Sequence, residues 1–202
     1  DQALAADVTL FRVEVANEIG VATNAGGRQS FRNVGRTARE GIETSLSWRI
    51  TPQWRAQTAV TLLNATYRDG FLACAGIPCT AATVPVAAGN RIAGTQRGLA
   101  FADLAWQPFL GTEFGFETRA GSALTANDTN TESTARYSVF ALRARHRIPL
   151  PEKFELELLA RLDNITNKPY VGSVIVNDAN GRFYEPAALR SGLISLRLAR
   201  TF

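Results

Sequence analysis

The sequence predicts an all-β fold: an antiparallel meander of eight strands arranged as a transmembrane β-barrel. Three observations indicate this fold. Apolar and polar residues alternate with period two in eight runs, the connections alternate between short and long, and one face of the runs is almost free of charge. Turn residues bound each run, and no helix is needed anywhere along the chain. The eight strands either close on themselves or form part of a larger barrel.

The runs are long, and their connections differ in kind. A tilted membrane strand needs about 9 to 11 residues, whereas strands of soluble proteins average about 5 to 6. Tight turns marked by Pro lie at 51–53, 108–111 and 149–153, and long loops rich in Gly, Asn and Asp fill the alternate connections. Short turns on one rim and long loops on the other are typical of outer-membrane barrels. The predicted strands are 7–19, 31–50, 54–68, 97–107, 112–125, 135–148, 154–164 and 192–202.

Alternate residues along each run separate an apolar face from a charged face. In the first run this rule places Phe11 and Val13 on the apolar face and Arg12 and Glu14 on the charged face. A charge at the bilayer midplane costs about 2–4 kcal/mol, so lipid requires a nearly charge-free face, which a soluble sheet merely permits. We therefore favour a membrane barrel over a soluble β-sandwich, which the alternation alone does not exclude. Aromatic residues gather at the short-turn ends, as in an interfacial girdle: Trp48, Trp54, Trp106, Phe109, Phe154 and Phe202.

The composition argues against several other classes of protein. No run of about 18 apolar residues is present, which excludes a transmembrane helix. The net charge of +4 comes from Arg residues that are spread along the chain, so a nucleic-acid partner is not expected. His146, the only histidine, has no partner for a catalytic triad, and no metal-ligand cluster or cofactor motif is present, so the protein is not expected to be an enzyme. Cys74 and Cys79 lie in one loop and predict a local disulfide, with two free thiols as the alternative.

Three segments resemble TonB-dependent outer-membrane receptors of the siderophore type. FRNVGRTAREGIETSLSW at 31–48 is similar to a strand of that family, LARLDNITNKPYVGS at 159–173 to its penultimate strand, and NDANGRFYEPAALRS at 177–191 to its last long loop. Where the family usually continues Pro-Gly-Arg, this chain has Ala188, Leu189 and Arg190. Its terminal strand ends on Phe202, which resembles the signal recognised by the barrel-assembly machinery. The first segment matches the family pattern at Asn33, Gly35, Arg36, Thr37, Gly41, Ile42 and Glu43.

The resemblance implies a barrel of about 22 strands, of which this chain supplies eight. Residues 1–202 are then expected to be the C-terminal portion of the receptor barrel, with the plug domain absent. The receptor is expected in the bacterial outer membrane, where it takes up a ferric siderophore or a similar iron chelate with energy from TonB. Two alternatives stay open: a self-contained eight-stranded outer-membrane barrel with an anchoring or adhesion role, and a soluble β-sandwich binding module.

The resemblance also suggests partners and ligand-binding residues. The partners are outer-membrane lipid and lipopolysaccharide, the barrel-assembly machinery, the ferric siderophore, and TonB through the missing N-terminal region. Charged residues such as Arg143, Arg161 and Asp163 are interpreted as structural ion pairs. An anionic chelate would be met by cationic and aromatic residues at the rim of the long loops. The candidates there are Arg28, Arg91, Arg97, Arg182, Tyr184, Glu185 and Arg190.

Overall fold

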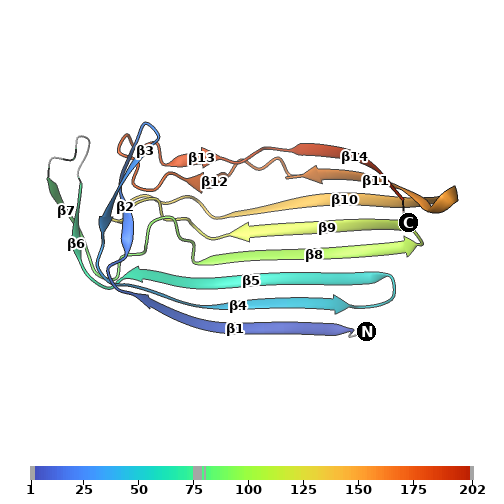
Figure 1. The fold of residues 1–202 in the computed structure, drawn as a ribbon, viewed down its shortest axis with the longest axis horizontal. Helices are drawn as coiled ribbons and strands as arrows, with labels where there is room; N and C mark the ends of the chain where they lie inside the picture. Colours follow the sequence, from blue (N-terminus) through green and yellow to red (C-terminus); the bar gives the residue numbers. More distant parts are fainter. Residues whose placement is uncertain (1–2, 75–78, 80, 201–202) are drawn as a thin grey trace.

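The structure is a computed structural model that describes residues 3–74, 79 and 81–200. Within this part of the chain, eight strands form one antiparallel sheet in which each strand pairs with the sheet strands before and after it. The strands run side by side, and the longer connections gather at one end (Figure 1). The predicted all-β meander is confirmed. Its strands are β1 (Leu4–Val15), β4 (Thr37–Arg49), β5 (Trp54–Tyr67), β8 (Gly98–Phe109), β9 (Thr112–Gly121), β10 (Tyr137–Leu150), β11 (Phe154–Asp163) and β14 (Ser191–Arg200).

The short connections lie at the other end of the sheet, as predicted. Between β4 and β5, Thr51 Oγ1 accepts hydrogen bonds from the backbone N–H groups of Gln53 (3.2 Å) and Trp54 (3.1 Å). Residues 110–111 join β8 to β9, and a single 3₁₀ turn, η1 (Pro151–Lys153), joins β10 to β11. Such tight turns allow consecutive strands to pair directly, so the order of strands in the sheet follows the chain.

Three of the long connections contain short hairpins that the sequence analysis did not predict. As a result the predicted strands 7–19 and 31–50 are too long, because their residues near the loops belong to a hairpin. Gly35 separates that hairpin from β4: its φ is +78°, and its backbone N–H donates a 2.8 Å hydrogen bond to Asn33 Oδ1. The hairpins are β2 (Ile19–Ala25) with β3 (Arg28–Asn33), β6 (Phe71–Cys74) with β7 (Ala82–Val86), and β12 (Val171–Val174) with β13 (Tyr184–Pro186).

The large sheet is open. Among the described residues, β1 and β14 form its two edges and do not pair with each other, so the closed eight-stranded barrel considered above is not observed. Nor does a second large sheet cover either face in this part of the chain, as a β-sandwich would require. No described helix is long and apolar enough to cross a membrane. Phe202, the proposed assembly signal, lies outside the described residues.

The apolar face of the sheet is exposed over its whole width. Leu10 in β1 is 77% exposed and Ile194 in β14 is 84% exposed, although both are large aliphatic residues. At the short-turn end, the rings of Trp54 and Trp106 stack on this face with centroids 5.7 Å apart. An exposed apolar surface of this extent indicates contact with a membrane or another apolar partner.

The face assignment predicted for β1 is wrong. Leu10 pairs with Ile42 and Phe11 pairs with Gly41. Because directly paired residues share a face, the even-numbered residues of β1 lie on the apolar face and Phe11 on the charged face. Arg12 and Glu14 therefore lie on the apolar side, near the long loops. The large apolar residues of β1 are even-numbered up to Leu10 and odd-numbered from Phe11 onward, so the alternation changes phase within the strand, and the pairing with β4 places all even-numbered residues on the apolar face.

A small core holds the hairpin β6–β7 against the end of β5. Val34, Tyr67 and Val86 are buried, and Phe71 and Ile92 pack against them. The rings of Tyr67 and Phe71 meet edge to face with centroids 4.9 Å apart. This packing brings the loop between β5 and β8 back over the end of the sheet.

We predict that Gly41→Ala destabilises the sheet, whereas Gly98→Ala is tolerated. A Cβ on Gly41 would collide with the carbonyl oxygen of Leu62 and lie 2.8 Å from Phe11 Cζ, whereas a Cβ on Gly98 would make ordinary contacts, with Leu62 Cδ2 at 3.5 Å and the Thr61 carbonyl oxygen at 4.0 Å. Overpacking of this kind costs about 1–3 kcal/mol. Urea unfolding of the two variants in detergent checks this, and equal midpoints would contradict it.

Candidate functional site

The long loops meet at the buried carboxylate of Asp128, which is only 3% exposed. Tyr67 donates its hydroxyl hydrogen to Oδ1 at 2.6 Å, and Asn177 Nδ2 donates to Oδ2 at 2.8 Å. Arg32 Nη2 lies 3.3 Å from the same Oδ2 and supplies the compensating charge. A buried carboxylate is stable only when it is paired and hydrogen-bonded, so these three partners hold it in place.

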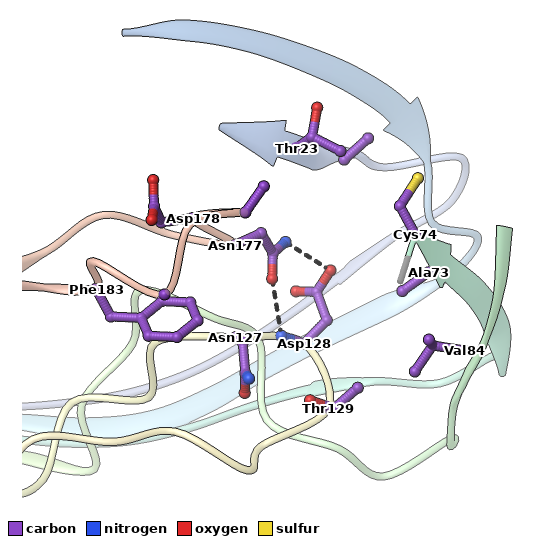
Figure 2. Close-up of a pocket in the computed structure, with 13 residues that line it drawn as sticks. Thr23, Ala73, Cys74, Val84, Asn127, Asp128, Thr129, Asn177, Asp178 and Phe183 are labelled. Atoms are coloured by element: carbon purple, nitrogen blue, oxygen red, sulfur yellow. Dashed lines mark hydrogen bonds between the residues drawn. The ribbon is translucent and has the colours of Figure 1, made fainter. Parts of the chain in front are cut away.

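Asn177 joins two further loop segments to this carboxylate. Its Oδ1 accepts a 3.0 Å hydrogen bond from the backbone N–H of Asp128, and its Nδ2 also donates to the carbonyl of Val21 at 2.7 Å. The backbone N–H of Asn24 donates to the Asn177 carbonyl at 3.3 Å. The side chains of Asn177 and Asp128 point toward each other, with both bonds drawn (Figure 2). The segment after β12 is thereby fixed against β2 and the β9–β10 loop.

Arg32 and the loop before β8 complete the junction. The Arg32 guanidinium lies over the ring of Phe71 at 4.5 Å from its centroid, and its Nη1 donates to the carbonyl of Leu72. Asn90 Nδ2 donates to the carbonyl of Asp128 at 2.9 Å. All four long connections, 16–36, 68–97, 122–136 and 164–190, thus share one hydrogen-bonded centre within the described residues. We call this set of contacts the Asp128 junction.

A cavity of about 360 Å³ opens beside the Asp128 junction. That volume falls at the lower end of the range typical of small-molecule sites, about 300–1,000 Å³. Polar side chains from β2, the β9–β10 loop and the segment after β12 line it together with one aromatic ring. No group of three or more His, Cys, Asp or Glu residues among those described is arranged to hold a metal ion. Several of the residues that line the cavity could hold a small molecule by hydrogen bonding and stacking. They are Thr23, Asn127, Thr129, Asn177, Asp178 and Phe183.

Cys74 and Cys79 form a disulfide at the edge of this cavity, with their Cα atoms 5.5 Å apart. Cys74 ends β6 and lines the cavity wall next to Ala73. The bridge therefore closes the tip of the β6–β7 hairpin, whose strands the small core already holds at their other end. The local disulfide expected from the spacing of the two cysteines is the arrangement seen.

None of the seven predicted ligand-binding residues lines the cavity in the described part of the chain. Arg91 is 9% exposed and its Nη1 donates to the carbonyl of Leu63, so its prediction as a rim residue is wrong. Burial lowers the pKa of its guanidinium. The rest are exposed and come from separate positions on the loops: Arg28, Arg97, Arg182, Tyr184, Glu185 and Arg190.

Three of the exposed candidates already hydrogen-bond to other loop residues, one of them on a neighbouring connection and two within their own connection. The Tyr184 hydroxyl donates to Glu132 Oε2 at 2.7 Å, and this bond raises the pKa of the phenol. Glu185 accepts a hydrogen bond from Ser173 Oγ. Arg190 Nη2 donates to the carbonyl of Ile165 at 2.7 Å. Tyr184, in β13, therefore contacts the β9–β10 loop and reinforces the contact that Asn177 makes with that loop.

Sequence reasoning missed Asp128 and Asn177, the two residues at the centre of the junction. One signal could have found them: the tetrapeptides Asn-Asp-Thr-Asn at 127–130 and Asn-Asp-Ala-Asn at 177–180 share one pattern. Asn and Asp side chains bond to nearby backbone groups and tolerate left-handed backbone. Asn130 and Asn177 do adopt positive φ, at 58° and 53°.

The charged face carries the ion pairs predicted for it. Arg143 Nη1 lies 2.7 Å from Glu117 Oε1 and also pairs with Asp103. Arg161 binds the same Glu117 at 2.7 Å and Asp163 at 2.8 Å. Structural pairing is confirmed for Arg143, Arg161 and Asp163, and it accounts for their charge without a ligand.

A further ion pair closes the base of the β2–β3 hairpin. Glu18 accepts hydrogen bonds from Arg39 and Thr37, with 2.9 Å between Arg39 Nη1 and Oε2. The backbone N–H of Glu18 donates to the Gly35 carbonyl at 2.9 Å. The hydrogen bond from Arg39 holds the pKa of the Glu18 carboxyl below its ordinary value of 4.5.

The sequence matches a known protein family, and the fold is similar to solved structures. A family model described as "TonB dependent receptor-like, beta-barrel" matches residues 1–165. Among solved structures, the siderophore receptor PiuA from Acinetobacter baumannii is 20% identical, with a TM-score of 0.71 over 96% of this chain and 26% of its own. The ferric yersiniabactin uptake receptor FyuA from Yersinia pestis is 12% identical, with a TM-score of 0.71 over 98% and 28%. The copper transporter OprC is 16% identical, with a TM-score of 0.67 over 97% and 29%.

We predict that Asp128→Asn loosens all four long connections together. An amide cannot accept hydrogen bonds on both sides, so Tyr67, Asn177 or Arg32 loses its acceptor, at a cost of about 2 kcal/mol. Hydrogen exchange should then accelerate by roughly thirtyfold in residues 21–24, 126–130 and 175–179. Asp178→Asn is the matched control, because it keeps an oxygen acceptor for the local turn. Faster exchange confined to 126–130 would show that the loops are not coupled.

We also predict that acid opens the β2–β3 hairpin. Because the folded pKa of Glu18 is depressed, its carboxylate stabilises the hairpin fully above the ordinary value of 4.5 and loses that contribution as the pH falls through the folded pKa. Hydrogen exchange of residues 19–33, corrected for intrinsic rates, should be constant above that value and rise below it. Glu18→Gln should abolish the step, and Glu152→Gln, in the turn at the opposite end, should keep it. A step that persists in Glu18→Gln would assign it to another group.

Proposed function

The chain belongs to the TonB-dependent receptor β-barrel family, and from that premise we propose that it supplies barrel wall and long extracellular loops to a bacterial outer-membrane receptor for a ferric siderophore or similar iron chelate. Proteins of this family are receptors and transporters rather than enzymes. The observation that carries the proposal is the combination of this family match with an exposed apolar face and a charged face whose ion pairs are satisfied within the sheet.

The apolar face supports a location in the outer membrane. Lipid would cover the exposed aliphatic residues of β1 and β14, and the stacked tryptophans would lie at the periplasmic interface. Arg12 pairs with Glu14 and Glu40 near the long-loop ends, so these three charges would lie toward the extracellular surface rather than at the bilayer midplane. Arg200 lies on the same face at the short-turn end, with its guanidinium 5.1 Å from the ring centroid of Phe154. The charged face would line the lumen.

We propose that residues 1–202 are the C-terminal portion of such a receptor barrel. The chain spans about a quarter of the length of the solved structures that it resembles. The open edges at β1 and β14 would then receive neighbouring strands of the same barrel. Contact with TonB and the plug would belong to other parts of the receptor, and Phe202 would serve the barrel-assembly machinery.

Ligand recognition is proposed for the loop end of the sheet. Arg182 is exposed, and its backbone N–H donates to Asp178 Oδ2 at 2.7 Å. Among the described residues its guanidinium forms no hydrogen bond or ion pair. Arg190 lies on the same long connection. Two guanidinium groups held on loops that share the Asp128 junction would present fixed positive charge to an anionic ferric chelate.

The test uses the full receptor that contains this chain, expressed in cells without a competing uptake system. The double variant Arg182→Ala/Arg190→Ala should weaken binding of the ferric chelate about five- to tenfold, since each exposed charge contributes up to about 1 kcal/mol. Arg12→Ala, an exposed arginine on the apolar side of β1, is the matched control and should keep wild-type affinity. Uptake of radioactive iron should require TonB.

Two outcomes would count against the proposal, and they do so at different levels. Unchanged affinity in the double variant, with normal heat-modifiable mobility on gels, would remove these arginines from the ligand site. Iron uptake that is equal with and without TonB would contradict the receptor function itself.

A further inference from the structure

A groove opens on the apolar face near the long-loop ends, separate from the cavity beside Asp128. Its volume is about 390 Å³, and it crosses β5, β8, β9 and β10. Val60 pairs with Ala100, Ala100 with Ala120, and Ala120 with Ser138, so these side chains lie in one row on one face of the sheet. The same register places the row on the face that carries Ile42.

The groove exists because small side chains replace large ones here. Gly98, Ala100, Ala120 and Ser138 form its floor, and Leu62 stands at its side. Toward the short turns the same face carries Phe140 two positions further along β10 and Phe116 four positions further along β9, and their rings stack with centroids 5.8 Å apart. The apolar face therefore changes from a raised aromatic surface to a hollow one as it approaches the loops.

Two cations lie at the loop end of the groove. Arg136 and Lys168 both line it and are exposed, and no carboxylate is among its described lining residues. Other cations near the long-loop ends are neutralised: Arg12 pairs with Glu14, and Arg36 pairs with Asp69 at 2.8 Å. Within the described chain, neither Arg136 nor Lys168 forms a salt bridge with a carboxylate. The groove thus combines an apolar floor with uncompensated positive charge at one end.

We propose that this groove retains one phosphorylated lipid of the outer leaflet. The phosphate of its headgroup is bound by Arg136 and Lys168, and one acyl chain lies along Ala100, Ala120 and Ser138. Charge complementarity favours an anionic headgroup, and the apolar floor favours an attached acyl chain, since two exposed cations alone hold a free anion weakly in water. The inference rests on the proposed function, because it requires this face to meet a bilayer whose outer leaflet lies on the long-loop side.

The test is native mass spectrometry of the full receptor in phosphatidylcholine nanodiscs that contain a small fraction of diphosphorylated lipid A. Wild type should retain one lipid A per receptor. Arg136→Glu/Lys168→Glu should reduce retention about 10- to 30-fold, from the roughly 1 kcal/mol that each basic residue contributes near anionic lipid. Ala120→Phe should reduce it without changing any charge, because the ring fills the groove. Arg12→Glu, a cation on the same face, should leave it unchanged.

Each remaining outcome decides against part of the proposal. If wild type and the Arg136→Glu/Lys168→Glu and Ala120→Phe variants retain equal amounts of lipid A, the lipid site is overturned. The proposed function would then be judged separately, from iron uptake by cells that carry the same variants. Retention of dephosphorylated lipid A to the same extent would remove the role of the two cations. If inorganic phosphate binds as tightly as lipid A, the acyl chain has no role in binding. If the receptor is found as a dimer that lacks lipid, the groove is an interface with a second copy. Failure of wild type to enter nanodiscs would contradict the proposed function as well.

Discussion

Pleating sends successive side chains of a strand to opposite faces, and the whole sheet depends on keeping unpaired charge off one of them. Arg143 and Arg161 both pair with Glu117 on the charged face, while Leu10 and Ile194 on the other face stay exposed. The two faces require different neighbours, so neither can be buried in the manner of a soluble core. The small cluster around Tyr67 serves only the loops.

The loops follow a different principle, because polar rather than apolar contacts hold them together. Asp128 receives hydrogen bonds from a tyrosine at the end of β5 and from an asparagine and an arginine on two other long connections. Each of those connections also carries at least one hairpin, bridge or backbone bond of its own, so the junction joins units that are already ordered. A surface composed of four loops thereby acquires fixed geometry without a continuous hydrophobic core, so the ligand binding proposed for it would carry little ordering cost.

Much of the sheet could be predicted from sequence, because period-two alternation and Pro-marked turns are local signals. The orientation of β1 could not be predicted in this way. Leu10 and Phe11 are both apolar, and only the pairing of Phe11 with Gly41 decides which of them lies on the apolar face. The hairpins were missed because strands of only three to seven residues, in loops rich in Gly and Asn, carry little alternation. Arg91 was misplaced because its burial depends on Asn130, which accepts from its backbone N–H at 2.7 Å from another loop. Asp128 depends on partners up to 96 residues away, and no local pattern encodes such a contact.

These sequence separations bear on the order in which the structure can form. Every pairing in the large sheet joins strands that are neighbours in it, so the sheet can grow one hairpin at a time at low cost in chain entropy. The bonds of the Asp128 junction span 61, 96 and 156 residues, and the longest of them, from Asn177 to Val21, reaches from the last long loop to the first. The junction can therefore close only after the chain has been laid down from Val21 to Asn177, so it depends on long-range contacts that the growth of the sheet from hairpins does not need.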